Sequence, residues 1–185
     1  MSHTFKQIAS TDHFGPWHSN YMEFYERLFR SVDHGSVLEI GCDGGGGILS
    51  YAEWFSRQAG IMLPRQLISC DISPRPESLD ANKQITHYQG NAYDGDFIRD
   101  VIEKHGPYAV MVEDGPHTLG SQQFFVQHYP PMLTKNGIAI VEDIQHPEHI
   151  TELYRRLPEG FVGYAVDLRL ADSRYDSLLF VIHRK

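Results

Sequence analysis

The sequence contains 185 residues, of which 41% are hydrophobic and 12% aromatic, and its net charge is −8 at neutral pH. This length and composition suit a single domain over residues 1–185 that buries its own core. The negative charge argues against nucleic acid as the main partner, because that binding depends on a basic surface. The apolar runs are too short to cross a membrane and the N-terminus lacks the apolar stretch of a signal peptide, so we expect a cytoplasmic protein with small-molecule partners.

Apolar runs alternate with helix-length segments between residues 37 and 157. Runs without polar alternation predict buried strands at residues 37–40, 67–71, 85–89, 108–112 and 137–141. Helical apolar spacing predicts helices at residues 48–58, 95–105, 120–133 and 147–157. This alternation indicates a parallel sheet covered on both faces. Residues 1–34 precede it, and we expect an aromatic helix at 21–29 to lie over the C-terminal rim of the sheet.

The alternation changes after residue 157. Residues 161–169 and 177–183 are strand-like, and the linking residues 170–176 leave no room for a helix. We therefore expect an antiparallel hairpin at the edge of the sheet. Cys42 and Cys70 lie at or beside the ends of strand-like runs and are expected to be reduced core thiols rather than a disulfide.

Acidic residues follow two neighbouring strands of the predicted sheet. Glu113 and Asp114 come after the run at 108–112, with His117 three residues later, and Glu142 and Asp143 come after the run at 137–141. Carboxylates gathered at the ends of parallel strands can hold a hard cation such as Mg²⁺, and a histidine beside them can accept a proton. The alternatives are solvated loop acids and an ordinary loop histidine. His146 and His149 are further candidates for the base or for extra ligands.

The first three strands are followed by residues that suit a nucleotide-like ligand. Gly41 and Gly45 belong to a glycine-rich loop that lets the backbone approach a ligand at a helix N-terminus, although the loop alone is weak evidence. Asp71 can accept hydrogen bonds from both ribose hydroxyls, or it can cap the turn that follows it. Asn91 can contact an adenine edge or belong to a plain turn.

These motifs together resemble the class I S-adenosylmethionine-dependent methyltransferases. The order that carries the resemblance is Glu39-x-Gly41, Asp71, Gly90-Asn91-Ala92 and Glu113-Asp114, followed by the hairpin. More narrowly, Asp114-Gly115-Pro116-His117 and Val141-Glu142-Asp143 resemble the metal-dependent sugar O-methyltransferases of macrolide-antibiotic tailoring. The resemblance implies a Rossmann-like α/β sandwich with a mostly parallel seven-stranded sheet. Two positions depart from the family pattern, because Asp43 replaces a glycine and Pro116 replaces a serine.

The resemblance also implies a role for each motif residue. The cofactor S-adenosyl-L-methionine would contact residues at the first four strand ends, namely Glu39, Gly41, Gly45, Asp71, Ile72, Asn91, Ala92 and Glu113. A Mg²⁺ ion would be bound by Asp114, Glu142 and Asp143. His117 would be the general base, catalytic together with Asp114. His18 and Tyr21, in the N-terminal segment, would contact the acceptor.

We therefore predict a Mg²⁺-dependent O-methyltransferase that acts on a hydroxyl of a sugar, another polyhydroxylated molecule or a glycan. We expect an open acceptor pocket, which a neighbouring subunit of a homo-oligomer can complete. One alternative is a nicotinamide-dependent oxidoreductase, although the sequence lacks Gly-x-Gly-x-x-Gly after the first strand. The other alternative is a non-catalytic module that binds S-adenosylmethionine.

Overall fold

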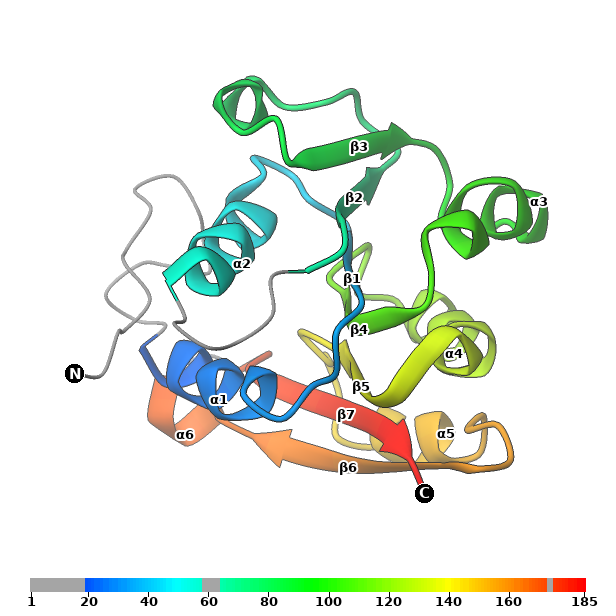
Figure 1. The fold of residues 1–185 in the computed structure, drawn as a ribbon. Coiled ribbons are helices and arrows are strands. Elements are labelled where there is room, and N and C mark those ends of the chain that lie inside the picture. The colour runs from blue at the N-terminus through cyan, green and yellow to red at the C-terminus, as the bar shows by residue number, and fades with distance from the viewer. Residues whose placement is uncertain (1–18, 58–63, 173–174) are drawn as a thin grey trace.

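The structure is a computed structural model that describes residues 19–57, 64–172 and 175–185. A single seven-stranded sheet runs through it in the order β3-β2-β1-β4-β5-β7-β6 (Figure 1). The strands are β1 Ser36–Ile40, β2 Leu67–Asp71, β3 Ile85–Gln89, β4 Tyr108–Glu113, β5 Leu133–Val141, β6 Phe161–Asp167 and β7 Leu178–Arg184. The first five are parallel, and β7 runs antiparallel to both β5 and β6. The predicted α/β fold with a C-terminal hairpin is confirmed.

Helices cover both faces of the sheet (Figure 1). They are α1 Ser19–Phe29, α2 Gly46–Arg57, α3 Gly95–Phe97, α4 Leu119–His128, α5 His149–Tyr154 and α6 Arg169–Asp172. After α3 the chain continues as a π turn over Ile98–Ile102 and a 3₁₀ turn over Glu103–His105, and other 3₁₀ turns span Glu77–Ala81 and Pro130–Met132. In the ranges described above, no helix is both long and apolar enough to cross a membrane.

The two faces of the sheet bury separate apolar clusters. One cluster joins α1 and α2 to the sheet, and the other joins α4, α5 and the turns after α3 to the opposite face. Phe29 of α1 is fully buried, stacked on Phe55 at 5.8 Å between ring centroids and edge-on to Tyr51 and Trp54 of α2. Phe29 and Tyr25 thus lie in the core. Helix α1, which we expected over the C-terminal rim, packs instead against α2 on this face of the sheet because its aromatic residues are buried there, and Tyr25 reaches the rim at Glu142.

Two of the differences from the sequence prediction have local causes. The helix expected at residues 120–133 ends at His128, because Pro130 and Pro131 lack the N–H groups that an α-helix needs, and β5 begins already at Leu133. The expectation that residues 170–176 leave no room for a helix was wrong. A single helical turn, α6, fits there because the Asp167 carboxylate accepts the Arg169 N–H at 3.1 Å and pairs with its guanidinium.

Strand register brings the functional loops to one edge of the sheet. Ile40, at the end of β1, is paired with Glu113 at the end of β4, and Glu113 is paired with Val141 at the end of β5. The strand order reverses between β1 and β4, because β2 and β3 lie on one side and β5 on the other. Ligands of open α/β sheets bind beyond the carboxyl ends of the strands at such a reversal.

We expect Phe29→Ala to lower the free energy of unfolding by about 3–5 kcal/mol, because it removes an aromatic ring from the centre of the cluster beneath α1 and α2. Leu170→Ala is the control, since Leu170 is 98% exposed and should change stability by less than about 0.5 kcal/mol. Urea unfolding followed by circular dichroism measures both variants. A Phe29→Ala loss no larger than that of Leu170→Ala would contradict the placement of α1 in the core.

Candidate active site

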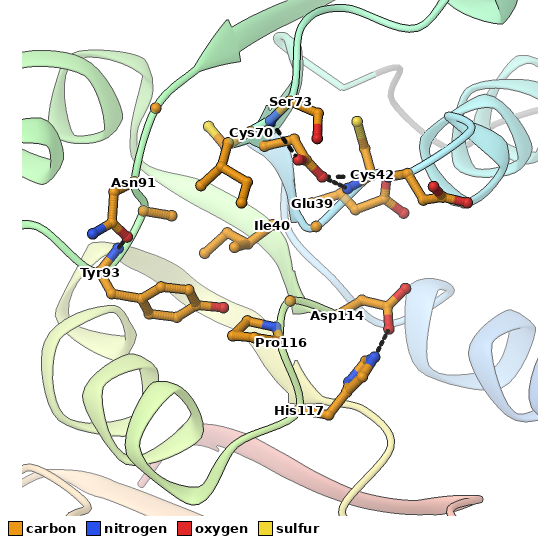
Figure 2. Close-up of a pocket in the computed structure, with 18 of the residues that line it drawn as sticks. Glu39, Ile40, Cys42, Cys70, Ser73, Asn91, Tyr93, Asp114, Pro116 and His117 are labelled. Atoms are coloured by element: carbon orange, nitrogen blue, oxygen red, sulfur yellow. Dashed lines mark hydrogen bonds and ion pairs between the residues drawn. The ribbon is translucent and has the colours of Figure 1, made fainter.

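A cavity of about 700 Å³ lies beyond the carboxyl ends of β1 to β4 (Figure 2). This volume is typical of small-molecule sites in proteins. Six residues predicted to contact a cofactor line it, namely Glu39, Gly41, Asp71, Ile72, Asn91 and Ala92. Asp114 and His117 line the same cavity, and Figure 2 shows them at the opposite end from Asn91. Gly45 and Glu113 do not belong to its lining.

Gly41 allows the loops after β1 and β4 to touch. Its φ is +80°, and a β-carbon there would lie 2.0 Å from the carbonyl oxygen of Asp114. The backbone N–H of Asp114 donates to the Ile40 carbonyl at 2.9 Å, so the two loops continue the pairing of their strands. Gly45 also has a φ of +80°, but a β-carbon there would meet the side chains of Leu79 and Ser78. Gly45 therefore shapes the loop without lining the cavity.

Glu39 and Asp71 fix the glycine-rich loop from two sides. The buried Glu39 carboxylate accepts the Ile48 N–H at 3.1 Å, near the N-terminus of α2, and a β-carbon at Gly47 would collide with it. Asp71 accepts the N–H groups of Cys42 at 2.9 Å and Ser73 at 2.8 Å. Asp71 thus both lines the cavity and caps the turn after β2, so the two roles considered from the sequence are compatible.

The charge of Asp71 is stabilised by backbone hydrogen bonds. Partial burial acts to raise the pKa of this carboxyl, but the N–H groups of Ser73 and Cys42 together outweigh it and hold the pKa below its usual value. An ionised carboxylate is a pure hydrogen-bond acceptor. Asp71 therefore presents acceptor oxygens in the wall of the cavity.

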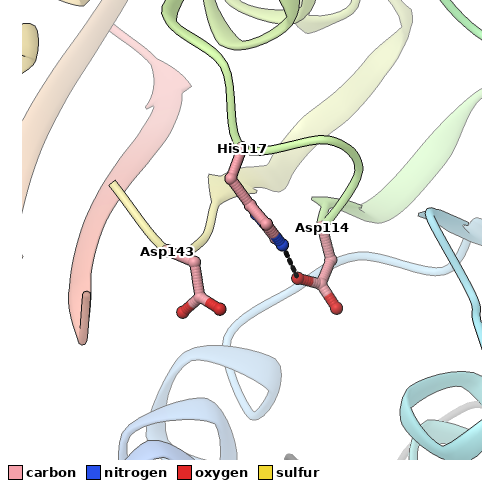
Figure 3. Close-up of side chains that lie close together, drawn as sticks. All are labelled: Asp114, His117 and Asp143. Carbon is pink, nitrogen blue, oxygen red and sulfur yellow. Dashed lines mark ion pairs between the residues drawn. The ribbon is translucent and has the colours of Figure 1, made fainter. Parts of the chain in front are cut away.

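Asp114, His117 and Asp143 form a compact group beside the cavity (Figure 3). Each offers a potential metal ligand, and these three atoms all lie within 4.8 Å of one another. The His117 Nε2 lies 3.9 Å from the Asp114 Oδ1. Figure 3 shows the imidazole directed toward Asp114, with Asp143 arriving from the loop after β5. The two carboxylates suit a hard divalent cation, and an imidazole beside them can accept a proton.

Two members of this group have strained backbones. The φ angles of His117 and Asp143 are +53° and +49°, and Asp43 in the glycine-rich loop has +38°. Side-chain-bearing residues in this region cost of order 1–3 kcal/mol each, and such residues cluster at active sites and ligand clamps. Asp43 keeps the loop conformation that a glycine would adopt, because aspartate tolerates it better than most residues.

Glu113 and Glu142, the first members of the two acidic pairs, are fully buried and lie outside the compact group of described residues. The Tyr93 hydroxyl donates to Glu113 Oε1 at 2.5 Å, and the Tyr25 hydroxyl donates to Glu142 Oε1. Tyr93 was not among the residues predicted for the site, although it follows Asn91 by two residues and lines the cavity. No motif in the sequence predicts a hydrogen bond between either tyrosine and its glutamate, because the partners are far apart along the chain.

The other four residues predicted for the site are His146, His149, His18 and Tyr21, and the structure describes the side chains of the first two. The rings of His146 and His149 lie edge-on, with 5.1 Å between centroids, and neither joins the compact acid and histidine group. His18 lies outside the described residues. Tyr21 belongs to α1, and its side chain is also outside the described part of the structure. Their predicted contact with an acceptor stays a prediction.

Comparisons with known proteins confirm the fold and the resemblance seen in the motifs. In an alignment 144 residues long that covers 73% of the chain, it is 28% identical to the 8-demethyl-8-(2-methoxy-α-L-rhamnosyl)-tetracenomycin-C 3′-O-methyltransferase of Streptomyces olivaceus. The structure of the MycE methyltransferase with Mg, SAH and mycinamycin VI matches 94% of the chain with a TM-score of 0.68 and 18% identity. CalS11, a TDP-rhamnose 3′-O-methyltransferase, matches 76% of the chain with a TM-score of 0.58 and 14% identity. The chain has the class I methyltransferase fold.

The similarity covers only part of these longer proteins. The chain spans 34% of the Streptomyces enzyme, 50% of MycE and 70% of CalS11. No protein-family model matches the chain.

The pKa of Glu113 predicts a pH dependence of stability. Burial raises this pKa from 4.5 to about 8, with Asp114 and Asp143 adding to the rise despite the hydrogen bond from Tyr93. Between these values the folded state keeps a proton that the unfolded state has released. The contribution to stability is therefore full below pH 4.5 and is lost as pH rises toward 8, at no more than about 1.4 kcal/mol per pH unit.

Glu113→Gln removes this titration while keeping the side-chain volume. Urea unfolding in EDTA from pH 5 to 8 should show the wild-type stability falling relative to that of the variant. Parallel curves for the two proteins would mean that Glu113 is already ionised in the folded state.

Proposed function

We propose that this chain is an S-adenosylmethionine-dependent O-methyltransferase that binds Mg²⁺ and methylates a hydroxyl of a sugar or another polyhydroxylated acceptor. The observation that carries the proposal is the position of Asp114 and His117. Both line the 700 Å³ cavity, and both belong with Asp143 to one compact group, in which the two carboxylates can hold a divalent cation and the imidazole can accept a proton. A cofactor cavity and a metal and base site therefore meet at one edge of the sheet.

The cavity wall has the groups that an adenosine-containing cofactor requires. Asp71 offers carboxylate oxygens for ribose hydroxyls, and Asn91 offers a side-chain amide beside Ala92 for the adenine edge. Ile72 is 75% exposed although it is apolar, which suits a residue that a bound base covers. Glu39 and Gly41 then border the methionine part of the cofactor, near Asp114.

The donor set fits a divalent cation. Asp114 and Asp143 are the carboxylate ligands that we propose for Mg²⁺, with Glu142 beside them as the third acid predicted from the sequence. A bound Mg²⁺ supplies Lewis acidity, which orients the acceptor hydroxyls and lowers their pKa. The strain at Asp143 supports a functional reason for its conformation.

His117 is the general base in this proposal. It accepts the proton of the acceptor hydroxyl at Nε2 as the oxygen attacks the methyl carbon. The new bond joins that oxygen to the methyl group, and the carbon–sulfur bond breaks, leaving neutral S-adenosylhomocysteine. Asp114 lies 3.9 Å from the imidazole and stabilises the imidazolium that forms. His117 is one-third exposed, which leaves room for an acceptor to approach.

The acceptor class is supported by the relatives. The Streptomyces relative is named as a 3′-O-methyltransferase of a rhamnosyl tetracenomycin, and CalS11 is named as a TDP-rhamnose 3′-O-methyltransferase. MycE has been solved with Mg and SAH. A deoxysugar with neighbouring hydroxyls is therefore the first acceptor to test, since such a pair can bind one cation.

Transfer of a radiolabelled methyl group from S-adenosylmethionine to a panel of rhamnosides tests the proposal. We expect EDTA to stop the transfer and added Mg²⁺ to restore it. Asp114→Asn and Asp143→Asn should abolish it, and His117→Ala should lower kcat by about 10²- to 10⁴-fold. Asp100→Asn, at an exposed acid in the π turn after α3, is the matched control and should retain full activity.

Each part of the proposal has an outcome that contradicts it. Unchanged transfer in EDTA would exclude the metal, and unchanged kcat in His117→Ala would exclude the base. Binding of NADH in preference to S-adenosylmethionine would favour the oxidoreductase alternative.

A further inference from the structure

In both acidic pairs, Glu113-Asp114 and Glu142-Asp143, the first acid and the second acid have different surroundings. In each pair the second acid, Asp114 or Asp143, joins the compact group with His117. The first acid, Glu113 or Glu142, is fully buried and accepts a hydrogen bond from a tyrosine hydroxyl. Tyr93 lines the proposed cofactor cavity, so its contact with Glu113 belongs to that side of the site. The contact to Glu142 comes from a different element, helix α1.

The Tyr25 ring is held rigidly in the core. Only 1% of Tyr25 is exposed. Its ring stacks on Phe29 with 5.5 Å between centroids and lies edge-on to Tyr51 at 6.1 Å. The hydroxyl of a ring packed in this way has few other positions, because close packing allows little rotation. Tyr25 therefore presents its hydroxyl to Glu142 at a fixed point.

The backbone of Glu142 is fixed independently of Tyr25. The Glu142 N–H donates to the Glu113 carbonyl at 2.9 Å, and the Gln122 side-chain amide donates to the Glu142 carbonyl at 3.1 Å. These contacts place Glu142 next to the end of β4, where Asp114 follows. Because the main chain is already held, the Tyr25 hydroxyl acts on the orientation of the Glu142 carboxylate.

We propose that Tyr25 is a positioning residue of the cation site, through which α1 orients Glu142 beside Asp114 and Asp143. The inference rests on the proposed function only in requiring that the site bind a divalent cation. Hydrogen-bond partners that orient the acids of a metal site raise its affinity, and their loss typically costs about 10- to 100-fold.

Mn²⁺ binding followed by calorimetry and electron paramagnetic resonance, without cofactor or acceptor, tests this role. We expect Tyr25→Phe, which keeps the ring and removes only the hydroxyl, to weaken Mn²⁺ binding about 10- to 100-fold. Tyr108→Phe is the matched control. Tyr108 is equally buried, and its hydroxyl donates to the Ile102 carbonyl at 2.7 Å from the start of β4, away from the site. It should leave Mn²⁺ binding unchanged.

Two further measurements separate positioning from general damage. Affinity for S-adenosylhomocysteine should stay the same in Tyr25→Phe. Glu142→Gln should weaken Mn²⁺ binding as well, and the double variant should lose less than the sum of the two single losses, because both changes act on one contact.

Unchanged or tighter Mn²⁺ binding in Tyr25→Phe, or an equal loss in Tyr108→Phe, would overturn the role of Tyr25 while leaving the cation site intact. Failure of the wild type to bind Mn²⁺ would instead overturn the metal part of the proposed function, and this inference with it.

Discussion

The close approach of the loops after β1 and β4 is the constraint on which the site depends. Gly41 lies against the carbonyl of Asp114 at a distance that excludes any β-carbon. This contact places the wall of the cavity directly beside the acid and histidine group. If the loops were further apart, the proposed methyl donor and proton acceptor would not face the same space, and one acceptor hydroxyl has to reach both of them.

The site also concentrates features that oppose folding. Left-handed backbones occur at Asp43, His117 and Asp143, and the fully buried Glu113 and Glu142 lie nearby. The two apolar clusters on either side of the sheet must offset these costs. Burial of α1 by Phe29 and Tyr25 contributes to that stability and, in our proposal, also orients an acid of the site. Packing and function are therefore joined in one helix.

Much of the fold follows from sequence patterns. Apolar runs without polar alternation located the five parallel strands, and the two closing runs located the hairpin, since both signals are local. The end of α4 depended on two prolines, and α6 depended on a cap from Asp167, which the apolar pattern does not reveal. The location in the cytoplasm, the single domain over 1–185 and a homo-oligomer remain predictions.

The site was partly predictable. Glu39, Gly41, Asp71, Asn91, Asp114 and His117 were expected from motifs at strand ends, and all of them line one cavity. The sequence could not show that Glu142 contacts Tyr25, because 117 positions separate them and only the packing of α1 brings them together. Nor could it place Gly45 away from the cavity, because the direction that a glycine faces depends on the folded loop.

A crystal structure with S-adenosylhomocysteine and Mn²⁺ would show whether the cofactor cavity and the cation site meet, because anomalous scattering locates Mn²⁺ without ambiguity. We expect the cofactor product in the cavity between Asp71 and Asn91, with one anomalous peak within coordination distance of both Asp114 and Asp143. Saturating Mn²⁺ that gives no peak there, or S-adenosylhomocysteine bound elsewhere, would contradict this expectation.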